Sequence, residues 1–331
     1  MTINLYSPDT YSDGPPFAEF ERLRRENPVS WQEIPGQPGY WAILRHADVV
    51  HVSRNPLLFA CEPGGVVLED MEPERLARMR DMLLSMDPPR HIAYRKPLAP
   101  EFSQRIIGSM DAQVRAITRE ILAGAAEIGD VEFVHDVVGP LPTQVIGQLF
   151  GLPEADWALL HRLAQMNTSG QDPEFNPDGD LQEVGSADSS IQMALYGMDF
   201  AKSRRAMEPQ GDLMDVILGQ EFGGRRLSDS DIGSMLVQMI TAGNDTTVTM
   251  MAGGLWALLE HPDQLDALRQ DRALLPGAIE EILRWFTPLH YFRRTATSDT
   301  EIAGQPIATG EKVAMYYTSA NRDEKVFSDA G

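Results

Sequence analysis

Apolar residues recur at three- and four-residue intervals through the middle of the chain, which is typical of amphipathic helices. This spacing predicts helices over residues 91–105, 108–127, 137–151, 154–168, 186–207, 211–219, 229–260, 262–270 and 276–287. A polar, Gly- and Pro-containing stretch at residues 169–180 separates two of these helices, and we expect it to be a mobile loop.

Apolar and polar residues alternate near both ends of the chain, which predicts short strands. Towards the N-terminus we expect a helix over residues 17–26, a hairpin of 29–34 and 40–44 around a turn at 35–39, and a short helix at 46–50. After Pro288 we expect strands at 294–297, 300–302, near 307 and at 312–317. The pattern predicts a mainly α fold with a minor β part, in one domain over residues 1–331.

The formal net charge of −21 argues against nucleic acid and anionic membrane surfaces as partners. No apolar run approaches the ~20 residues of a spanning helix, and the first residues do not resemble a signal peptide. The single cysteine, Cys61, cannot form an internal disulfide, as suits a reducing compartment. We therefore expect a cytoplasmic protein without a membrane anchor.

A polar break interrupts the longest predicted helix, residues 229–260, in the segment Thr241–Thr247. The flanking sequence is almost wholly apolar, and a helix that is apolar on all sides is buried. Burying an acid and adjacent hydroxyls in such a helix is costly unless they are paired or have a function. One interpretation is proton delivery by Asp245 and Thr246 to a bound oxygen species, with Gly243 admitting a flat ligand. The alternative is a helix kink with Asp245 facing a solvated gap.

Three weaker features each have a structural and a functional interpretation. His91 and Arg95 lie four apart on a predicted helix, so they either bind an anion together or form a solvated face. Arg294 enters a predicted strand, where it either binds an anion or lies at an exposed edge. Glu281 and Arg284 lie three apart and could be a surface ion pair.

In their order and spacing, these motifs resemble those of the soluble bacterial cytochrome P450 enzymes, which are haem-thiolate monooxygenases. The resemblance covers the chain from RHADVV at residues 45–50 to its end. It rests on HIAYR (91–95), AGNDTT (242–247), EILR (281–284), RTATSDTEIAG (294–304) and SANRDEKVF (319–327). It implies the cytochrome P450 fold, truncated at the C-terminus.

The resemblance assigns roles to these residues. Asp245 and Thr246 are similar to the acid–alcohol pair that delivers protons to iron-bound dioxygen. Glu281 and Arg284 are similar to a pair that fixes the proximal core. The remaining roles are haem propionate binding by His91, Arg95 and Arg294, contact with the distal haem face by Ala242 and Gly243, and substrate-pocket lining by Thr241, Leu289, His290 and Tyr291.

The resemblance further implies an activity: hydroxylation of an apolar small molecule with O2 and haem b (iron protoporphyrin IX). The runs MDPPRH, RTATSDTEIAG and YTSANRDE look most like members that act on sterol side chains or terpenoids. No flavin or iron–sulfur motif occurs here, so electrons are expected from a ferredoxin and its reductase. The alternative is a non-catalytic helical module that binds apolar ligands, if the chain truly ends at Gly331.

The axial cysteine of the family follows the SANRDE segment, so we expect it beyond Gly331, and no metal ligand is predicted within the chain. Cys61 lies where the resemblance places no ligand, and we expect a small, partly buried residue there. Iron also accepts imidazole, but no histidine lies near the proximal segment. Two explanations stay open, a protein that stops here and, as we expect, a fragment of a longer enzyme.

Overall fold

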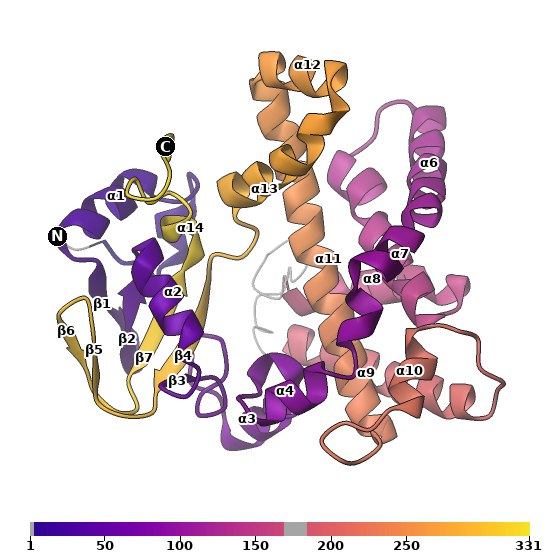
Figure 1. Cartoon of the computed structure of the whole chain (residues 1–331), viewed down its shortest axis with the longest axis horizontal. Helices are drawn as coiled ribbons and strands as arrows, with labels where there is room; N and C mark the ends of the chain where they lie inside the picture. Colours follow the sequence, from indigo (N-terminus) through magenta and orange to yellow (C-terminus); the bar gives the residue numbers. More distant parts are fainter. Residues whose placement is uncertain (1–2, 169–183) are drawn as a thin grey trace. The chain divides into compact units, whose positions relative to one another are not determined.

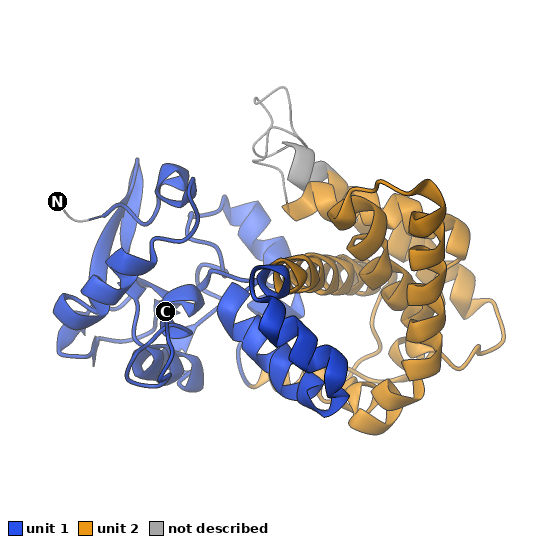
Figure 2. Cartoon of the chain, turned by 90° about the horizontal axis from the view of Figure 1, so that it is seen from above, with its two compact units in different colours: residues 1–88, 257–331 blue, residues 89–256 orange. Residues whose placement is uncertain are grey.

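The computed structural model describes residues 3–168 and 184–331. The expected mobile loop at 169–180 lies outside the described residues. The chain divides into two compact units, and Figure 2 distinguishes them by colour. Unit 1 comprises residues 1–88 and 257–331, and unit 2 comprises residues 89–256.

Unit 1 is built on a five-stranded sheet with the order β1-β2-β7-β4-β3 (Figure 1). β2 and β7 pair in parallel, whereas the other neighbours are antiparallel. The strands are β1 (Val29–Ile34), β2 (Gln37–Ile43), β3 (Phe59–Ala60), β4 (Tyr291–Ala296) and β7 (Lys312–Tyr316), with a separate hairpin of β5 (Thr300–Ile302) and β6 (Gln305–Ile307). The helices are α1 (Phe17–Glu26), α2 (His46–Arg54), α3 (Pro73–Met79), α12 (Pro262–Gln270), α13 (Leu275–Phe286) and α14 (Tyr317–Ala320).

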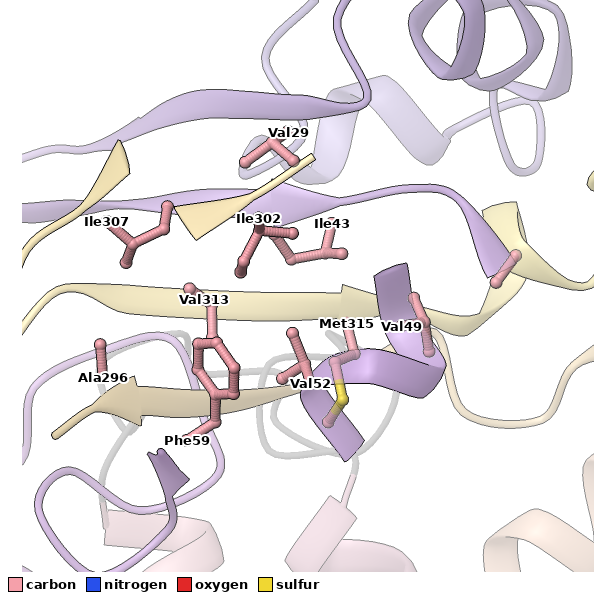
Figure 3. Close-up of a cluster of buried hydrophobic side chains, with 11 residues drawn as sticks. Val29, Ile43, Val49, Val52, Phe59, Ala296, Ile302, Ile307, Val313 and Met315 are labelled. Atoms are coloured by element: carbon pink, nitrogen blue, oxygen red, sulfur yellow. The ribbon is translucent and has the colours of Figure 1, made fainter. Parts of the chain in front are cut away.

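Alternate residues of β7 enter two apolar clusters on opposite faces of the sheet. Val313 and Met315 join one cluster, with side chains from α2 and from the β5–β6 hairpin (Figure 3). Ala314 and Tyr316 join the other, where the Tyr316 hydroxyl lies 2.7 Å from that of Tyr40. β7 is therefore buried on both faces, as its unbroken apolar run from Val313 to Tyr317 requires.

Unit 2 is helical, and its longest helix is α11 (Asp229–Glu260), whose last residues are assigned to unit 1. Ser228 caps α11, because its Oγ accepts from Asp231 N–H while its own N–H donates to the Asp231 carboxylate at 2.8 Å. The other α-helices are α4 (Arg90–Arg95), α5 (Gln104–Ser109), α6 (Asp111–Ile128), α7 (Pro140–Phe150), α8 (Glu154–Thr168), α9 (Val184–Arg205) and α10 (Leu213–Gly219).

The sequence predicted the bounds of α8, α11 and α12 correctly. The single helix expected over 91–105 is wrong: it divides into α4, a 3-10 turn at Ala99–Phe102 and α5, because prolines at 97 and 100 interrupt it. The β1–β2 turn is also shorter than expected, since β2 begins at Gln37. The short elements α3 and β3 were not predicted.

Candidate functional site

The polar break of α11 keeps the helix continuous, with one hydroxyl turned back onto the backbone. Thr246 Oγ1 donates to the carbonyl of Ala242 at 2.8 Å. Ala242 is exposed and Asp245 is partly buried, whereas Asn244 is 1% exposed. The helix is therefore not buried on all sides. It carries an acid and a hydroxyl within one turn of an exposed small residue.

Burial raises the pKa of the Asp245 carboxyl, because the ionised form loses solvation. The neighbouring side chains of Thr168 and Asn244 act in the opposite direction, since they stabilise the carboxylate. Thr168 is the last residue of α8. Asp245 therefore keeps its proton at a higher pH than an exposed aspartate does, which suits a group that holds and transfers a proton.

Gly243 allows a close contact within unit 2. A Cβ at this position would lie 2.7 Å from Ile146 Cδ1 of α7. The missing side chain therefore brings α11 and α7 together, and the exposed neighbour at this point is Ala242. Contact of Ala242 and Gly243 with a flat ligand stays a prediction.

α4 presents His91 and Arg95 four residues apart, as predicted. The helix is fixed by Tyr94, which is buried against Phe222 at 6.0 Å between ring centroids. The Tyr94 hydroxyl also accepts from Arg225 at 3.1 Å. Arg95 is exposed and His91 is partly buried. Among the described residues Arg95 has no acidic partner, so its charge is available to an anion.

Two neighbouring arginines on β4 have different surroundings, which the sequence did not distinguish. Arg293 is buried, pairs with Asp70 at 2.9 Å and also donates to the carbonyl of Leu68. Arg294, on the other face of the strand, is half-buried and donates to the carbonyl of Arg293 at 2.8 Å. Within the described residues Arg294 has no carboxylate partner, so it is the arginine of this strand that can bind an anion.

The residues predicted to line the substrate pocket lie in both units. In unit 2, Thr241 Oγ1 accepts from Asn167 Nδ2 at 3.0 Å, which fixes the hydroxyl on α11. In unit 1, His290 Nδ1 lies 2.8 Å from Thr318 Oγ1. Tyr291 packs on Tyr316 at 5.4 Å between ring centroids, and burial raises its pKa to about 12. Leu289 is partly buried.

Glu281 and Arg284 form the predicted pair on α13, 2.6 Å apart. Arg284 has a side chain only 10% exposed, and it donates to the carbonyl of Asn321 at 2.8 Å. Both residues line a hollow of about 450 Å³ together with Phe327, over which the Arg284 guanidinium lies. The pair therefore ties α13 to the chain after α14, which agrees with a structural role.

The single thiol does not suit the role of a metal ligand. Cys61 is 6% exposed, and its backbone N–H donates to the Asp87 carboxylate at 2.9 Å. Burial raises the pKa of the thiol to about 11, so the thiolate is disfavoured. No group of three or more His, Cys, Asp or Glu residues able to hold a metal occurs in the part of the chain that the structure describes.

By their chemistry, the residues of the two units suit part of the requirements of a haem, but the chain lacks an iron ligand. Arg95 and Arg294 are cations without carboxylate partners among residues 3–168 and 184–331, as propionate binding requires. Ala242, the hydroxyl of Thr246 and the carboxyl of Asp245 supply a small residue and proton-carrying groups. A thiolate for the iron is not offered by Cys61, and the sequence holds no other cysteine.

The sequence interpretation missed a polar contact beneath the break. Thr143 of α7 donates to Asn244 Oδ1 at 3.0 Å, and His161 of α8 lies 3.2 Å from the same hydroxyl. Asn244 was quoted within a motif but received no role. Its position one residue before Asp245 could have indicated a role for Asn244. Its partners could not be predicted in this way, because they are remote in sequence.

Comparisons with known proteins identify the family of this chain. The family model described as Cytochrome P450 matches residues 198–331. A steroid C26-monooxygenase of Mycolicibacterium smegmatis is 36% identical over 95% of this chain and 74% of that protein. A linalool 8-monooxygenase of Pseudomonas putida is 35% identical over 99% of this chain and 81% of that protein.

Solved structures show the same fold. A cytochrome P450 of Mycobacterium marinum in complex with pseudoionone superposes with a TM-score of 0.87 at 34% identity, covering 94% of this chain and 76% of that one. No helix in the described part of this chain is long and apolar enough to cross a membrane. The identity to the relatives and the length that it covers show that this chain belongs to the cytochrome P450 monooxygenase family.

Proposed function

We propose that this chain carries the distal and propionate-binding residues of a haem-dependent monooxygenase that hydroxylates an apolar small molecule. The observation that carries the proposal is the adjacent acid and hydroxyl on α11, with Thr246 bonded to the carbonyl of exposed Ala242. Bound haem b supplies the iron that binds and activates O2. The residues of this chain would hold the haem and handle protons.

His91 and Arg95 of unit 2, and Arg294 of unit 1, would bind the propionates of the haem. Guanidinium groups form charge-assisted hydrogen bonds with carboxylates, and these are stronger than neutral ones. Arg95 and Arg294 are suitable because no carboxylate in the described part of the chain neutralises them. A cysteine thiolate for the haem iron would have to come from outside the 331 residues, because Cys61 is buried and burial raises its pKa.

Asp245 and Thr246 would move protons. The carboxyl of Asp245, whose pKa burial raises, holds a proton that it can pass on when the site needs one. Thr246 Oγ1 donates to the Ala242 carbonyl, so its lone pairs are left to accept a hydrogen bond. Rotation of that hydroxyl would turn its proton away from the Ala242 carbonyl and make it available for transfer.

The relatives suggest the class of substrate. They include enzymes named for a steroid, for linalool and, in Mycobacterium bovis, for a methyl-branched lipid. All three are apolar, which suits Leu289 and Tyr291, two of the residues that we propose, with Thr241 and His290, to contact the substrate. We propose a sterol, terpenoid or similar substrate in the cytoplasm, with electrons from a ferredoxin and its reductase.

The test replaces Thr246 by alanine in the haem-loaded protein. With linalool, a steroid and a methyl-branched fatty acid as probes, we would measure oxygen consumed, peroxide released and hydroxylated product. General acid catalysis contributes about 10²–10⁴-fold. We therefore expect the T246A protein to consume oxygen and release peroxide, with a product yield per oxygen at least ~10-fold below that of the parent.

The matched control is Thr247→Ala, one residue further along α11, which should preserve coupling. If the T246A protein forms as much product per oxygen as the parent, Thr246 does not deliver protons. A colourless protein that takes up no haem, but still binds an apolar probe, would instead support a non-catalytic binding module.

A further inference from the structure

α7 packs on α8 in unit 2 and also contacts α11, where Gly243 meets Ile146 of α7 (Figure 1). Gly139, Thr143 and Gly147 follow one another at four-residue intervals, so they share one face of the helix. A Cβ at Gly139 would lie 3.3 Å from His161 Cε1, and one at Gly147 would collide with Trp157. The His161 ring is therefore held against the first turn of α7.

A chain of hydrogen bonds leads from this ring to α11. His161 Nδ1 lies 3.2 Å from Thr143 Oγ1, and Thr143 Oγ1 donates to Asn244 Oδ1 at 3.0 Å. Thr143 and Asn244 are 3% and 1% exposed, so water does not compete with these contacts. A threonine hydroxyl has a single proton. Because that proton goes to Asn244, the His161 contact requires Nδ1–H as the donor.

The three hydrogen-bonding groups can also be arranged with every donor and acceptor reversed. If the Asn244 amide turns over, Nδ2 donates to Thr143, and Thr143 donates to the bare Nδ1 of His161. The two ends of an amide have nearly the same shape, so both orientations fit the same space. In the present orientation Asn244 Nδ2 is buried and makes no hydrogen bond of standard geometry with a described residue, although the Asn244 side chain is close enough to Asp245 to stabilise its carboxylate.

We propose that His161 and Thr143 are positioning residues that select which end of the Asn244 amide faces Asp245. A facing N–H stabilises the ionised carboxylate, whereas a facing carbonyl favours the protonated acid. An imidazolium cannot accept at Nδ1, so protonation of His161 fixes the orientation that is present here. This inference rests on the proposed function only in that Asp245 is taken as a proton carrier.

The groups around His161 set the pH at which it becomes protonated and fixes the orientation of the Asn244 amide. Burial lowers the pKa of its imidazole, and His135 and Arg162 lower it further, whereas Asn244 opposes them. α7 carries no charged residue, and α11 contributes Asp245 next to Asn244. His161 is therefore neutral at neutral pH, and both orientations of the Asn244 amide are then possible. At low pH, protonation of His161 allows only the orientation in which Oδ1 accepts from Thr143.

The test uses the haem-free 331-residue chain with ¹⁵N-labelled histidine and ¹³C-labelled aspartate carboxyls. NMR titration reports the protonation of His161 and of Asp245 separately. In the parent we expect the carboxyl signal of Asp245 to show a second inflection at the titration of His161. T143V should abolish that inflection and change the acid dissociation constant of Asp245 about threefold or more, whereas T143S should restore both.

The matched control is Thr118→Val, because Thr118 donates only to Val114 of its own helix, at 2.7 Å. The T118V protein should titrate like the parent. A parent whose Asp245 signal ignores His161 overturns the proposal, and this comparison needs no variant that folds poorly. Since no turnover is measured, failure here is independent of whether T246A uncouples the haem-loaded protein.

Discussion

Buried polar groups are paired differently in the sheet of unit 1 and on α11 of unit 2. In the sheet, Arg293 and Lys312 are charged, have side chains 5% and 4% exposed, and each lies 2.9 Å from Asp70. Both also donate to the carbonyl of Leu68, at 3.3 and 3.1 Å. On α11, Asn244 is neutral and equally buried; its Nδ2 has no partner in the described residues, and neither has Arg293 Nε in the sheet.

The difference separates groups that hold the fold from groups that can change partners. A buried cation enclosed by a carboxylate and carbonyls has no alternative arrangement of similar energy, because an unpaired buried charge is costly. A neutral amide with a free end can turn over at a much smaller cost. The cations of the sheet are therefore structural, whereas the neutral amide on α11 can change its partners.

The neighbouring arginines of β4 give the largest test of this distinction. Arg293→Met removes the buried guanidinium that bonds Asp70 and the Leu68 carbonyl, which leaves Lys312 as the remaining donor to both. We expect the free energy of unfolding to fall by about 3 kcal/mol. Arg294→Met, on the other face, should change it by less than about 0.5 kcal/mol. Urea unfolding of both variants measures this.

The same two variants also test haem binding. R294M should retain the stability of the parent but bind haem more weakly, because a propionate loses its cation. Equal stability losses in the two proteins would show that the enclosure of Arg293 does not distinguish it from its neighbour. The comparison therefore predicts that R293M loses stability and that R294M loses affinity for haem.

The sequence predicted part of this site, for reasons that differ between the regions. The polar break of α11 stands out because its flanks are apolar, and Arg294 was identified through a motif. Arg293 was not distinguished from it, since alternation separates two faces of a strand but does not reveal what covers each. The partners of Asn244 were also missed, because Thr143 is 101 residues away and only the packing of α7 brings it close.

Helix bounds show the same limit on a smaller scale. α11 was predicted over its full length because Ser228 and Pro262 mark its ends in the sequence. The region 91–105 was predicted as one helix because its apolar spacing continues across prolines 97 and 100. Local periodicity therefore predicts which face is buried, and it predicts less well where the backbone stops being helical.

Two glycines of α11 test whether its position is fixed by backbone or by side-chain contacts. A Cβ at Gly233 would lie 2.5 Å from the carbonyl oxygen of Ala194, which is backbone, whereas one at Gly243 would meet only the end of Ile146. Alanine gains ~1 kcal/mol over glycine in a helix, and overpacking costs about 1–3 kcal/mol. We expect G233A to lose about 1–2 kcal/mol and G243A to change little.

Thermal unfolding of the two variants checks this prediction. A larger loss in G243A than in G233A would mean that Ile146 cannot move, and that α7 is held as rigidly as the backbone of α9. In that case the amide of Asn244, which lies beside this contact, would also be less able to turn over.

The smallest expected effect concerns Asp231, the charged residue that caps α11. Its hydrogen bonds with Arg225 lower its pKa to about 2, with help from Ser228 and against the effect of burial. The unfolded value is about 3.9, so the stabilisation is complete above it and is lost as the pH falls from about 4 to about 2. Because Arg225 is half-exposed, we expect at most about 1 kcal/mol.

D231N should therefore be slightly less stable than the parent near neutral pH, and its stability should fall less between pH ~4 and ~2. Asp266→Asn is the control, since that aspartate pairs with Arg269 at 3.2 Å with both side chains more than half exposed. Urea midpoints measured across this range decide the matter. Parallel curves for the parent and D231N would mean that the capping charge of α11 is screened by solvent, and that its fixed charges, unlike those enclosed in the sheet, contribute little to the fold.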